Sequence, residues 1–167
     1  MASLRESIPL QKRKIIKKSI ENSIGLLFIY GFFLFMLIVF KVNNPTSEIP
    51  KLFLRIACLL FIIISCFIIP FYEYWYYKRY FYDIDTKNII IRKGVIAQKE
   101  ITLPFSRITD VYVYQDILDV IFGLYDIHMS TPTEQSGQFA HIDGVDKSGN
   151  EKLKQIILTN INKEFKN

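Results

Sequence analysis

Cysteine, histidine and tryptophan are scarce in this chain of 167 residues, which has two Cys, two His and one Trp. Both cysteines, Cys58 and Cys66, fall within one apolar run, and two turns apart on a single helix they are too distant to form a disulfide with each other. The absence of a disulfide framework and of a Cys-x-x-Cys metal motif indicates a reducing compartment. We expect both cysteines to serve in packing.

The sequence also lacks the motifs with which common enzymes bind phosphate, zinc or acyl groups. It contains no glycine-rich phosphate loop, no His-Glu-x-x-His and no Gly-x-Ser-x-Gly. No groove-reading or base-stacking motif accompanies its basic residues, which argues against nucleic acid as a partner. These absences predict a protein that is not an enzyme, with no catalytic residue, no cofactor and no small-molecule substrate.

Long apolar runs without charge are what the sequence does contain. Ile24–Phe40 and Ile56–Ile69 are the cores of two stretches at about 20–40 and 52–72. A bilayer core needs roughly 20 apolar residues, and only a helix satisfies its backbone there. The rest of the chain is too small to bury two helices that are apolar on all sides, and the first run begins too late for a signal peptide. The sequence predicts a transmembrane hairpin over 20–79.

Basic residues account for the net charge of +5 and gather beside the two spans. By the positive-inside rule, this distribution places both termini in the cytoplasm and the loop Lys41–Lys51 outside. The aromatic segment after the second span is expected to settle at the headgroup level. The predicted lipid-interface residues are therefore Lys12, Arg13, Lys14, Lys17, Lys18, Trp75, Tyr76, Tyr77, Lys78 and Arg79.

After Tyr80 the apolar residues alternate, which is typical of strands. We expect Gly94 to form a turn and Pro104 to close a strand. The odd-numbered residues of 124–131 should face the core, where Ala140 joins them. The expected strands are 80–85, 88–93, 95–103, 108–115, 124–131 and 138–143.

One amphipathic helix is expected at the end of the chain. Ser148-x-x-Glu151 has the pattern of a capping box, and apolar residues recur every four positions from Leu153 to Phe165. Short strands followed by one helix suggest a bent β-sheet or barrel capped by that helix, which is pleckstrin-homology (PH) architecture. The predicted fold class is an α+β membrane protein: a basic segment 1–19, the hairpin 20–79 and a cytoplasmic PH-like domain 80–167.

Several short motifs in the second half of the chain carry a family resemblance. A basic-Gly turn, Pro-x-x-Arg-Ile, a Gln and a Phe-Gly-Leu element follow one another, and this order resembles the bacterial PH-like membrane-flanking domain family over about 81–165. Two spans before one such domain resemble its small YdbS-like members. Membership implies a PH-like barrel in the plasma membrane of a prokaryote, without known catalytic residues, a cofactor or a settled ligand. The matching positions are Gly94, Pro104, Arg107, Asp110, Gln115, Phe122 and Gly123.

The two histidines and two aspartates give the weak candidates for a metal site. If the last two strands pair as a hairpin whose turn lies near 134–135, His128 faces His141 and Asp126 faces Asp143. Two imidazoles and two carboxylates are ligands that zinc accepts. The simpler interpretation is that these four residues occupy the polar face of a sheet.

Taken together, the patterns predict a membrane-anchored scaffold or adaptor for a protein partner or for anionic lipid headgroups at the inner membrane face. Its expected partners are membrane lipids and a protein partner or further copies of the chain. One alternative is an accessory subunit of a membrane transport or envelope-stress and remodelling complex, which predicts co-purification of a larger multi-span protein. A metal-dependent enzyme, the other alternative, predicts stoichiometric metal.

Overall fold

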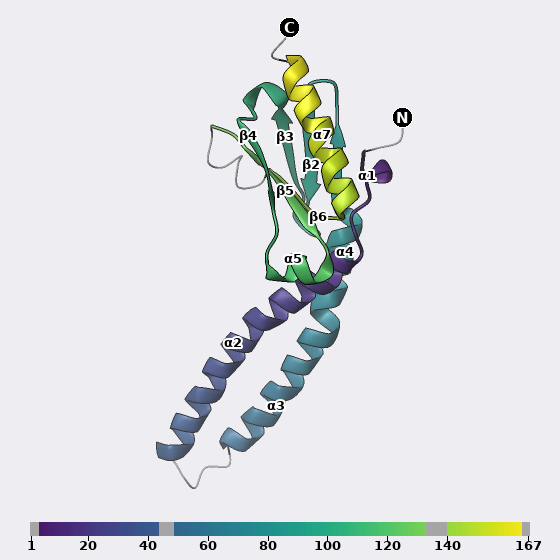
Figure 1. Cartoon of the computed structure of the whole chain (residues 1–167). Coiled ribbons are helices and arrows are strands. Elements are labelled where there is room, and N and C mark those ends of the chain that lie inside the picture. The colour runs from purple at the N-terminus through teal and green to yellow at the C-terminus, as the bar shows by residue number, and fades with distance from the viewer. Residues whose placement is uncertain (1–3, 44–48, 133–139, 165–167) are drawn as a thin grey trace. The chain divides into compact units, whose positions relative to one another are not determined.

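The computed structural model describes residues 4–43, 49–132 and 140–164, which belong to two compact units (Figure 1). The helical unit is Lys18–Tyr74. The sheet unit combines Met1–Lys17 with Trp75–Asn167. This grouping differs from the predicted boundaries, because the basic N-terminal segment belongs to the same compact unit as the strands.

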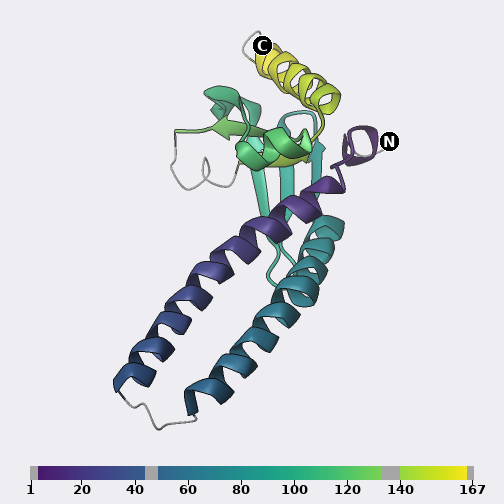
Figure 2. The ribbon, with the colours of Figure 1, turned by 60° about the horizontal axis from the view of Figure 1, so that its bottom comes forward.

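Two apolar helices make up the helical unit and run side by side in Figures 1 and 2. The first is α2 (Arg13–Asn43). The second consists of α3 (Ile49–Ile63), the π-helical turn η1 (Ile64–Ile68) and α4 (Ile69–Arg79). The π turn comes just before Pro70, which has no N–H for the helix ladder.

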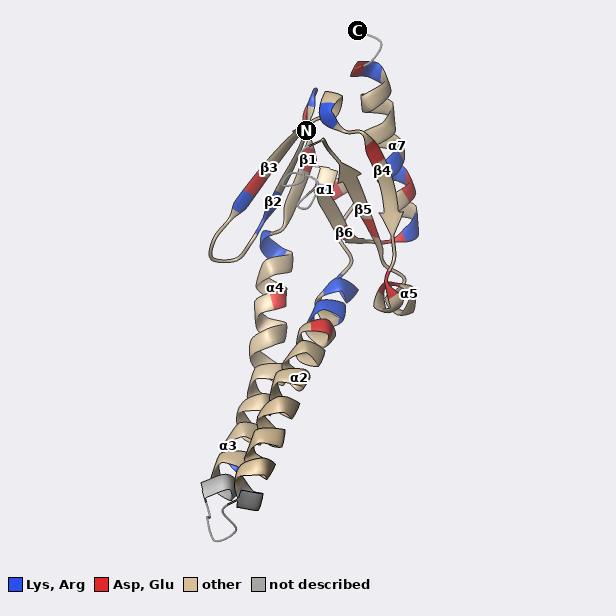
Figure 3. Cartoon of the chain, turned by 90° about the vertical axis from the view of Figure 1, so that its left-hand side faces the viewer, with Lys and Arg blue, Asp and Glu red and all other residues tan. Residues whose placement is uncertain are grey.

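Both helices are long and apolar enough to cross a membrane over Arg13–Phe40 and Leu52–Arg79. Their most apolar stretches are not buried at all within the protein, unlike the core helix of a soluble protein. Figure 3 shows few charged residues along α2 and α3. Residues 44–48 of the predicted outer loop lie outside the described part of the chain.

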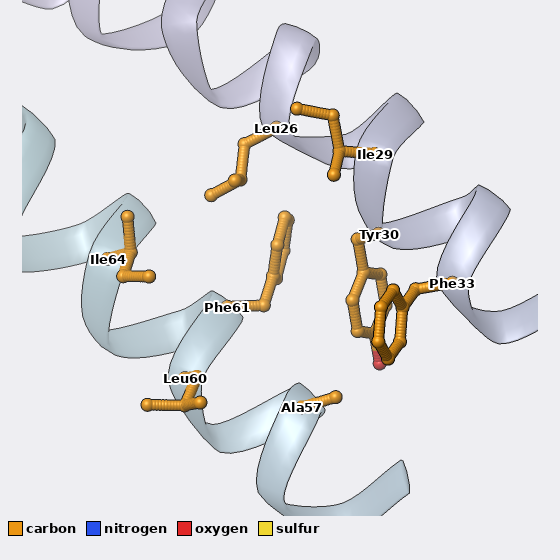
Figure 4. A pocket seen from close by; sticks show the side chains of 8 residues that line it. All are labelled: Leu26, Ile29, Tyr30, Phe33, Ala57, Leu60, Phe61 and Ile64. Carbon is orange, nitrogen blue, oxygen red and sulfur yellow. The ribbon is translucent and has the colours of Figure 1, made fainter. Parts of the chain in front are cut away.

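An apolar contact zone lies between the two helices. The Tyr30 hydroxyl is 2.6 Å from the Cys58 Sγ, and the Tyr30 ring stacks on Phe61 at 4.9 Å. Cys58 is thus half-buried in this packing, as predicted, whereas Cys66 is exposed. Side chains of both helices line a pocket of about 190 Å³ without a charged group (Figure 4): Leu26, Ile29, Tyr30, Phe33, Ala57, Leu60, Phe61 and Ile64.

Two three-stranded antiparallel sheets form the centre of the sheet unit, in the orders β1-β2-β3 and β4-β5-β6. The second strand matches its predicted bounds, and the others are shorter or displaced. The third starts late because Gly94 has a φ of 116° and the chain turns back so tightly that a Cβ there would lie 2.1 Å from the Ala97 carbonyl oxygen. The strands are β1 (Phe81–Ile84), β2 (Asn88–Lys93), β3 (Lys99–Pro104), β4 (Asp110–Tyr114), β5 (Tyr125–Ser130) and β6 (His141–Val145).

Helices complete this unit. The C-terminal helix α7 (Lys147–Glu164) packs against β4, β5 and the short η2 (Phe105–Arg107). The capping box predicted at Ser148 is wrong: α7 begins at Lys147, and the Asp146 carboxylate accepts the Gly149 N–H at 2.9 Å. Phe165, the last apolar position predicted for this helix, lies beyond the described residues.

Two short helices were not predicted. The first, α1 (Leu4–Ser7), contacts β1. The second, α5 (Ile117–Phe122), has a capping box in which Asp116 and Asp119 each accept the other's backbone N–H, and Gly123 ends it with a φ of 62°.

The core of the sheet unit includes residues from the N-terminal segment. Ile8 and Leu10 are 5% and 3% exposed, and they join the apolar faces of both sheets and of α7. The Tyr77 hydroxyl donates to the Leu10 carbonyl, and the Tyr82 hydroxyl donates to the Ile8 carbonyl. Ile127, Met129, Ala140 and Ile142 are buried in this core, as their alternation predicts.

Candidate functional site

A cluster of buried charges joins the N-terminal segment to the second sheet. Lys17 lies at its centre, with Nζ 2.8 Å from Asp116 Oδ2, 2.6 Å from Asp119 Oδ1 and 3.9 Å from Asp126 Oδ2. The Lys17 side chain is 3% exposed and that of Asp119 is fully buried. We call the whole set the ionic cluster; its members are Lys14, Lys17, Lys93, Asp116, Asp119, Asp126 and Asp143.

Lys14 makes the second link, one helical turn before Lys17. Its Nζ is 2.8 Å from Asp143 Oδ2 and donates to the Asp143 carbonyl at 3.1 Å. The same ammonium lies 4.1 Å from the centre of the Tyr80 ring, a cation–π contact. Gly144 makes room for the lysine, since a Cβ at its φ of 81° would lie 2.6 Å from Lys14 Cδ.

The pKa values of the cluster show which charges the fold favours. Burial alone would lower the pKa of Lys17, but hydrogen bonds to Asp116 and Asp119 outweigh it and raise the pKa above its usual value. Burial likewise opposes the ionised form of Asp143, yet Lys14 and Lys93 hold the pKa of that carboxyl far below its usual range.

The fold disfavours the charged form of two other members of the cluster. Burial lowers the pKa of Lys93 to about 8, although its Nζ lies 3.7 Å from Asp143 Oδ1. Burial, with Asp143 and Asp119 nearby, raises the pKa of Asp126 to about 6. The Asp126 carboxylate accepts the Gly144 N–H at 2.7 Å. The cluster thus contains strongly paired ions beside two groups whose charge the fold opposes.

The histidines lie next to the cluster. His128 pairs with His141 in the β5–β6 register, which confirms the predicted register at this position, and their rings stack at 5.1 Å. Asp126 does not pair directly with Asp143, because the register shifts between Tyr125 and Ile127. The predicted turn near 134–135 lies outside the described residues. Over the described ranges, no group of three or more His, Cys, Asp and Glu is placed to hold a metal ion.

His141 makes stability depend on pH. Burial lowers the pKa of its imidazole from 6.5 to about 4. The unfolded chain therefore takes up this proton at a higher pH than the folded chain, so His141 costs stability as the pH falls from 6.5 towards 4. We expect acidification from pH 7 to 4 to lower the free energy of unfolding more in the parent than in His141→Phe, by on the order of 2–3 kcal/mol.

Urea unfolding of the two proteins, followed at several pH values, measures this difference. Asp126 acts in the opposite direction, because its raised pKa makes its ionisation destabilising above about 3.8. Asp126 is present in both proteins, so its contribution cancels in the comparison. Parallel curves for parent and His141→Phe would contradict the role given to His141.

The predicted lipid-interface residues fall into different environments. Lys14 and Lys17 are buried in the ionic cluster, and Lys18 pairs with Glu21 at 2.8 Å. Tyr76 and Tyr77 are half-buried against the core. The others are exposed side chains of the sheet unit: Lys12, Arg13, Trp75, Lys78 and Arg79.

Two of those exposed residues also hold parts of the sheet unit in place. The Arg13 guanidinium donates to the Phe122 carbonyl at 3.0 Å, at the end of α5. The Arg79 guanidinium donates to the Val95 carbonyl at 2.6 Å, in the turn between β2 and β3. Lys12 and Lys78 are the remaining exposed cations of the predicted lipid-interface set.

The motif residues of the family resemblance are mostly structural. The Gln115 side-chain amide donates to the Leu124 carbonyl at 2.6 Å and thereby closes the loop that contains α5. Gly94 and Gly123 occupy positive-φ positions. Pro104 ends β3, whereas Arg107, the last residue of η2, and Asp110, the first residue of β4, are exposed.

Comparison with known proteins identifies one family. The family model described as "Bacterial PH domain" matches residues 26–161, which is well over half of the chain. The match includes most of α2 and all of the second apolar helix as well as the sheets. No curated protein and no solved structure matches the chain.

Proposed function

Because the chain belongs to the bacterial PH-domain family, we propose that it is a membrane-anchored, non-catalytic module that acts as a scaffold or adaptor at the inner membrane face. In this proposal α2 and the second apolar helix cross the plasma membrane, and both termini lie in the cytoplasm. The module binds either a protein partner or anionic lipid headgroups.

The membrane assignment rests on exposure as well as on length. Phe28, Ile29 and Phe67 are between 66% and 76% exposed, and most other apolar side chains of these helices are exposed too. Exposed apolar surface of this extent is unfavourable in water, whereas hydrocarbon removes the penalty. Asn22 Nδ2 donates to Glu73 Oε1 at 2.8 Å, so these two polar side chains of the helices satisfy each other.

The observation that carries the proposal is the burial of Lys14 and Lys17. These lysines belong to the first turns of α2, the helix that contains the first proposed span, and they are also part of the sheet unit. At the other end, only Tyr80 separates α4 from β1. The chain therefore passes from each proposed span into the sheet unit through helix or a single residue, which supports a module that stays close to the membrane.

Affinity purification of the full chain from native membranes tests the adaptor role. We expect either a stoichiometric protein partner or anionic lipid enriched well above its bulk fraction, because a scaffold must retain what it binds. Mass spectrometry of the purified protein and lipid measures both. The chain purified alone, with lipid of bulk composition, would contradict the proposal.

A matched variant separates the two occupants. Lys12 and Lys78 are exposed and lie outside the ionic cluster, so Lys12→Ala with Lys78→Ala should leave the fold intact. If headgroups are the ligand, the enrichment of anionic lipid should fall in this variant, because each Lys near an anionic surface contributes about 1 kcal/mol. A protein partner should be retained.

A further inference from the structure

Four aliphatic side chains in two segments of the sheet unit are exposed, and the packing of the unit does not cover them. On α5, Ile117, Val120 and Ile121 are 81%, 65% and 68% exposed. Their i, i+3 and i+4 spacing places them on one face of the helix, opposite Asp119. In the turn between β2 and β3, Ile96 is 93% exposed. We call these four residues the aliphatic rim.

The α5 part of the rim is attached to the start of α2 at both of its ends. Asp116 and Asp119 begin α5 and pair with Lys17 at 2.8 and 2.6 Å. Phe122 ends it and accepts the Arg13 guanidinium at 3.0 Å. Arg13 and Lys17 are one helical turn apart, so α5 is fixed to the first turn of α2.

Ile96 is attached to the end of the other apolar helix in the same way. Arg79 is the last residue of α4, and its guanidinium donates to the carbonyl of Val95, the neighbour of Ile96. Each apolar helix therefore ends in a basic side chain that holds an exposed aliphatic segment. α5 and the β2–β3 turn are thus both held by basic residues near the ends of the apolar helices. We therefore expect both parts of the rim to have the same surroundings.

The length of helix between these attachments and the predicted spans indicates that environment. Lys17 precedes Ile20, where the first predicted span begins, by about 5 Å along a helix that rises 1.5 Å per residue. Arg79 follows Tyr72, where the second span predicted from the sequence ends, by about 10 Å along the helix. The headgroup layer of one leaflet is about 5–8 Å thick, so both attachments fall within or next to it.

We propose that the aliphatic rim enters the inner leaflet, where its side chains lie at the boundary between headgroups and acyl chains. This inference rests on the proposed membrane anchoring and adds a second, peripheral contact of the sheet unit with lipid. Apolar side chains buried at this depth gain the hydrophobic contribution that holds interfacial helices. The exposed cations nearby, Lys12 and Lys78, would meet lipid phosphates.

Site-specific fluorescence with lipid-borne quenchers tests the proposal on the full chain. In a Cys58→Ala, Cys66→Ala background, single cysteines replace Ile96 or Ile121 and carry an environment-sensitive dye. The protein is reconstituted in phosphatidylcholine–phosphatidylglycerol vesicles, with or without brominated acyl chains. We expect blue-shifted emission at both positions and loss of most of it with brominated lipid.

Two control positions make the outcomes separable. Dye on a cysteine that replaces Leu158, a partly exposed aliphatic residue on α7, should show neither blue-shifted emission nor quenching. Phe28 lies within the first proposed span and should be quenched if that span crosses the bilayer. Quenching at Phe28 without quenching at Ile96 and Ile121 would overturn the rim proposal alone, and no quenching at Phe28 would overturn the membrane anchoring.

A protein occupant of the rim has its own signature. Dye at Ile121 that is blue-shifted but not quenched by brominated lipid would mean that protein, such as a second copy of the chain, covers α5. That result would also overturn the proposal. Emission like that of the Leu158 control would mean that the rim stays in water, and would overturn it as well.

Discussion

Replacing Lys17 with methionine is expected to lower the free energy of unfolding of the sheet unit by about 3–5 kcal/mol, the usual cost of leaving a buried ion without its partner. Asp119 is fully buried and faces Lys17 at 2.6 Å, and Asp116 also loses its ion pair. Hydrogen exchange of the β5 and β6 amides in the full chain, reconstituted in lipid nanodiscs, measures the change.

Two other lysines serve as matched controls for this substitution. Lys12→Met changes an exposed side chain and should alter stability by no more than about 0.5 kcal/mol. Lys93→Met should be neutral or stabilising near pH 7, because burial lowers the pKa of Lys93 to about 8 and the fold therefore opposes its charge. That benefit should fade as the pH rises from about 8 to 10.5, because the amine is neutral in both states only above the usual lysine pKa of 10.5. Equal losses for all three variants would contradict the account of the ionic cluster.

The strands and α7 are expected not to fold without the N-terminal segment. A fragment of residues 75–167 lacks Ile8 and Leu10, whose burial contributes about 1.5–3 kcal/mol each. It also leaves Asp119 buried without Lys17, at about 3–5 kcal/mol, and removes Lys14 from Asp143, which keeps only Lys93 at 3.7 Å. The combined loss is comparable to the whole stability of a typical domain, about 5–15 kcal/mol.

Joining residues 1–17 to residues 75–167 through a flexible linker should restore folding. This chain contains every residue of the sheet unit and omits the helical unit. Amide NMR spectra of the two proteins give the comparison: dispersed signals are expected for the linked chain and collapsed signals for the fragment. A well-dispersed spectrum from the fragment alone would show that the N-terminal segment is dispensable.

The elements with a regular pattern could be predicted from the sequence. The apolar runs gave both long helices, because their hydrophobicity is continuous, and alternation gave all six strands near their observed positions. The pairing of His128 with His141 followed from placing the hairpin turn near 134–135. The family match confirms the predicted bacterial PH domain.

The ionic cluster could not be predicted, because its pairs are distant in the sequence. With their neighbouring residues alone, Lys14 and Lys17 indicate only which side of the membrane this segment occupies. Their partners lie about a hundred positions later in the sequence. A local signal for α5 was present in Asp116-x-x-Asp119 and Gly123, although the helix is only six residues long. The apolar Ile8 and Leu10 beside the basic residues were the other available clue.

Thiol labelling in intact cells tests the central claim, a sheet unit anchored on the cytoplasmic side by two spans. In the Cys58→Ala, Cys66→Ala background, one cysteine replaces Ser47, which lies outside the described residues, and another replaces the exposed Thr159 of α7. We expect an impermeant maleimide to label the Ser47→Cys protein in intact cells and the Thr159→Cys protein only after permeabilisation. The reverse pattern, or equal labelling of both in intact cells, would contradict the claim.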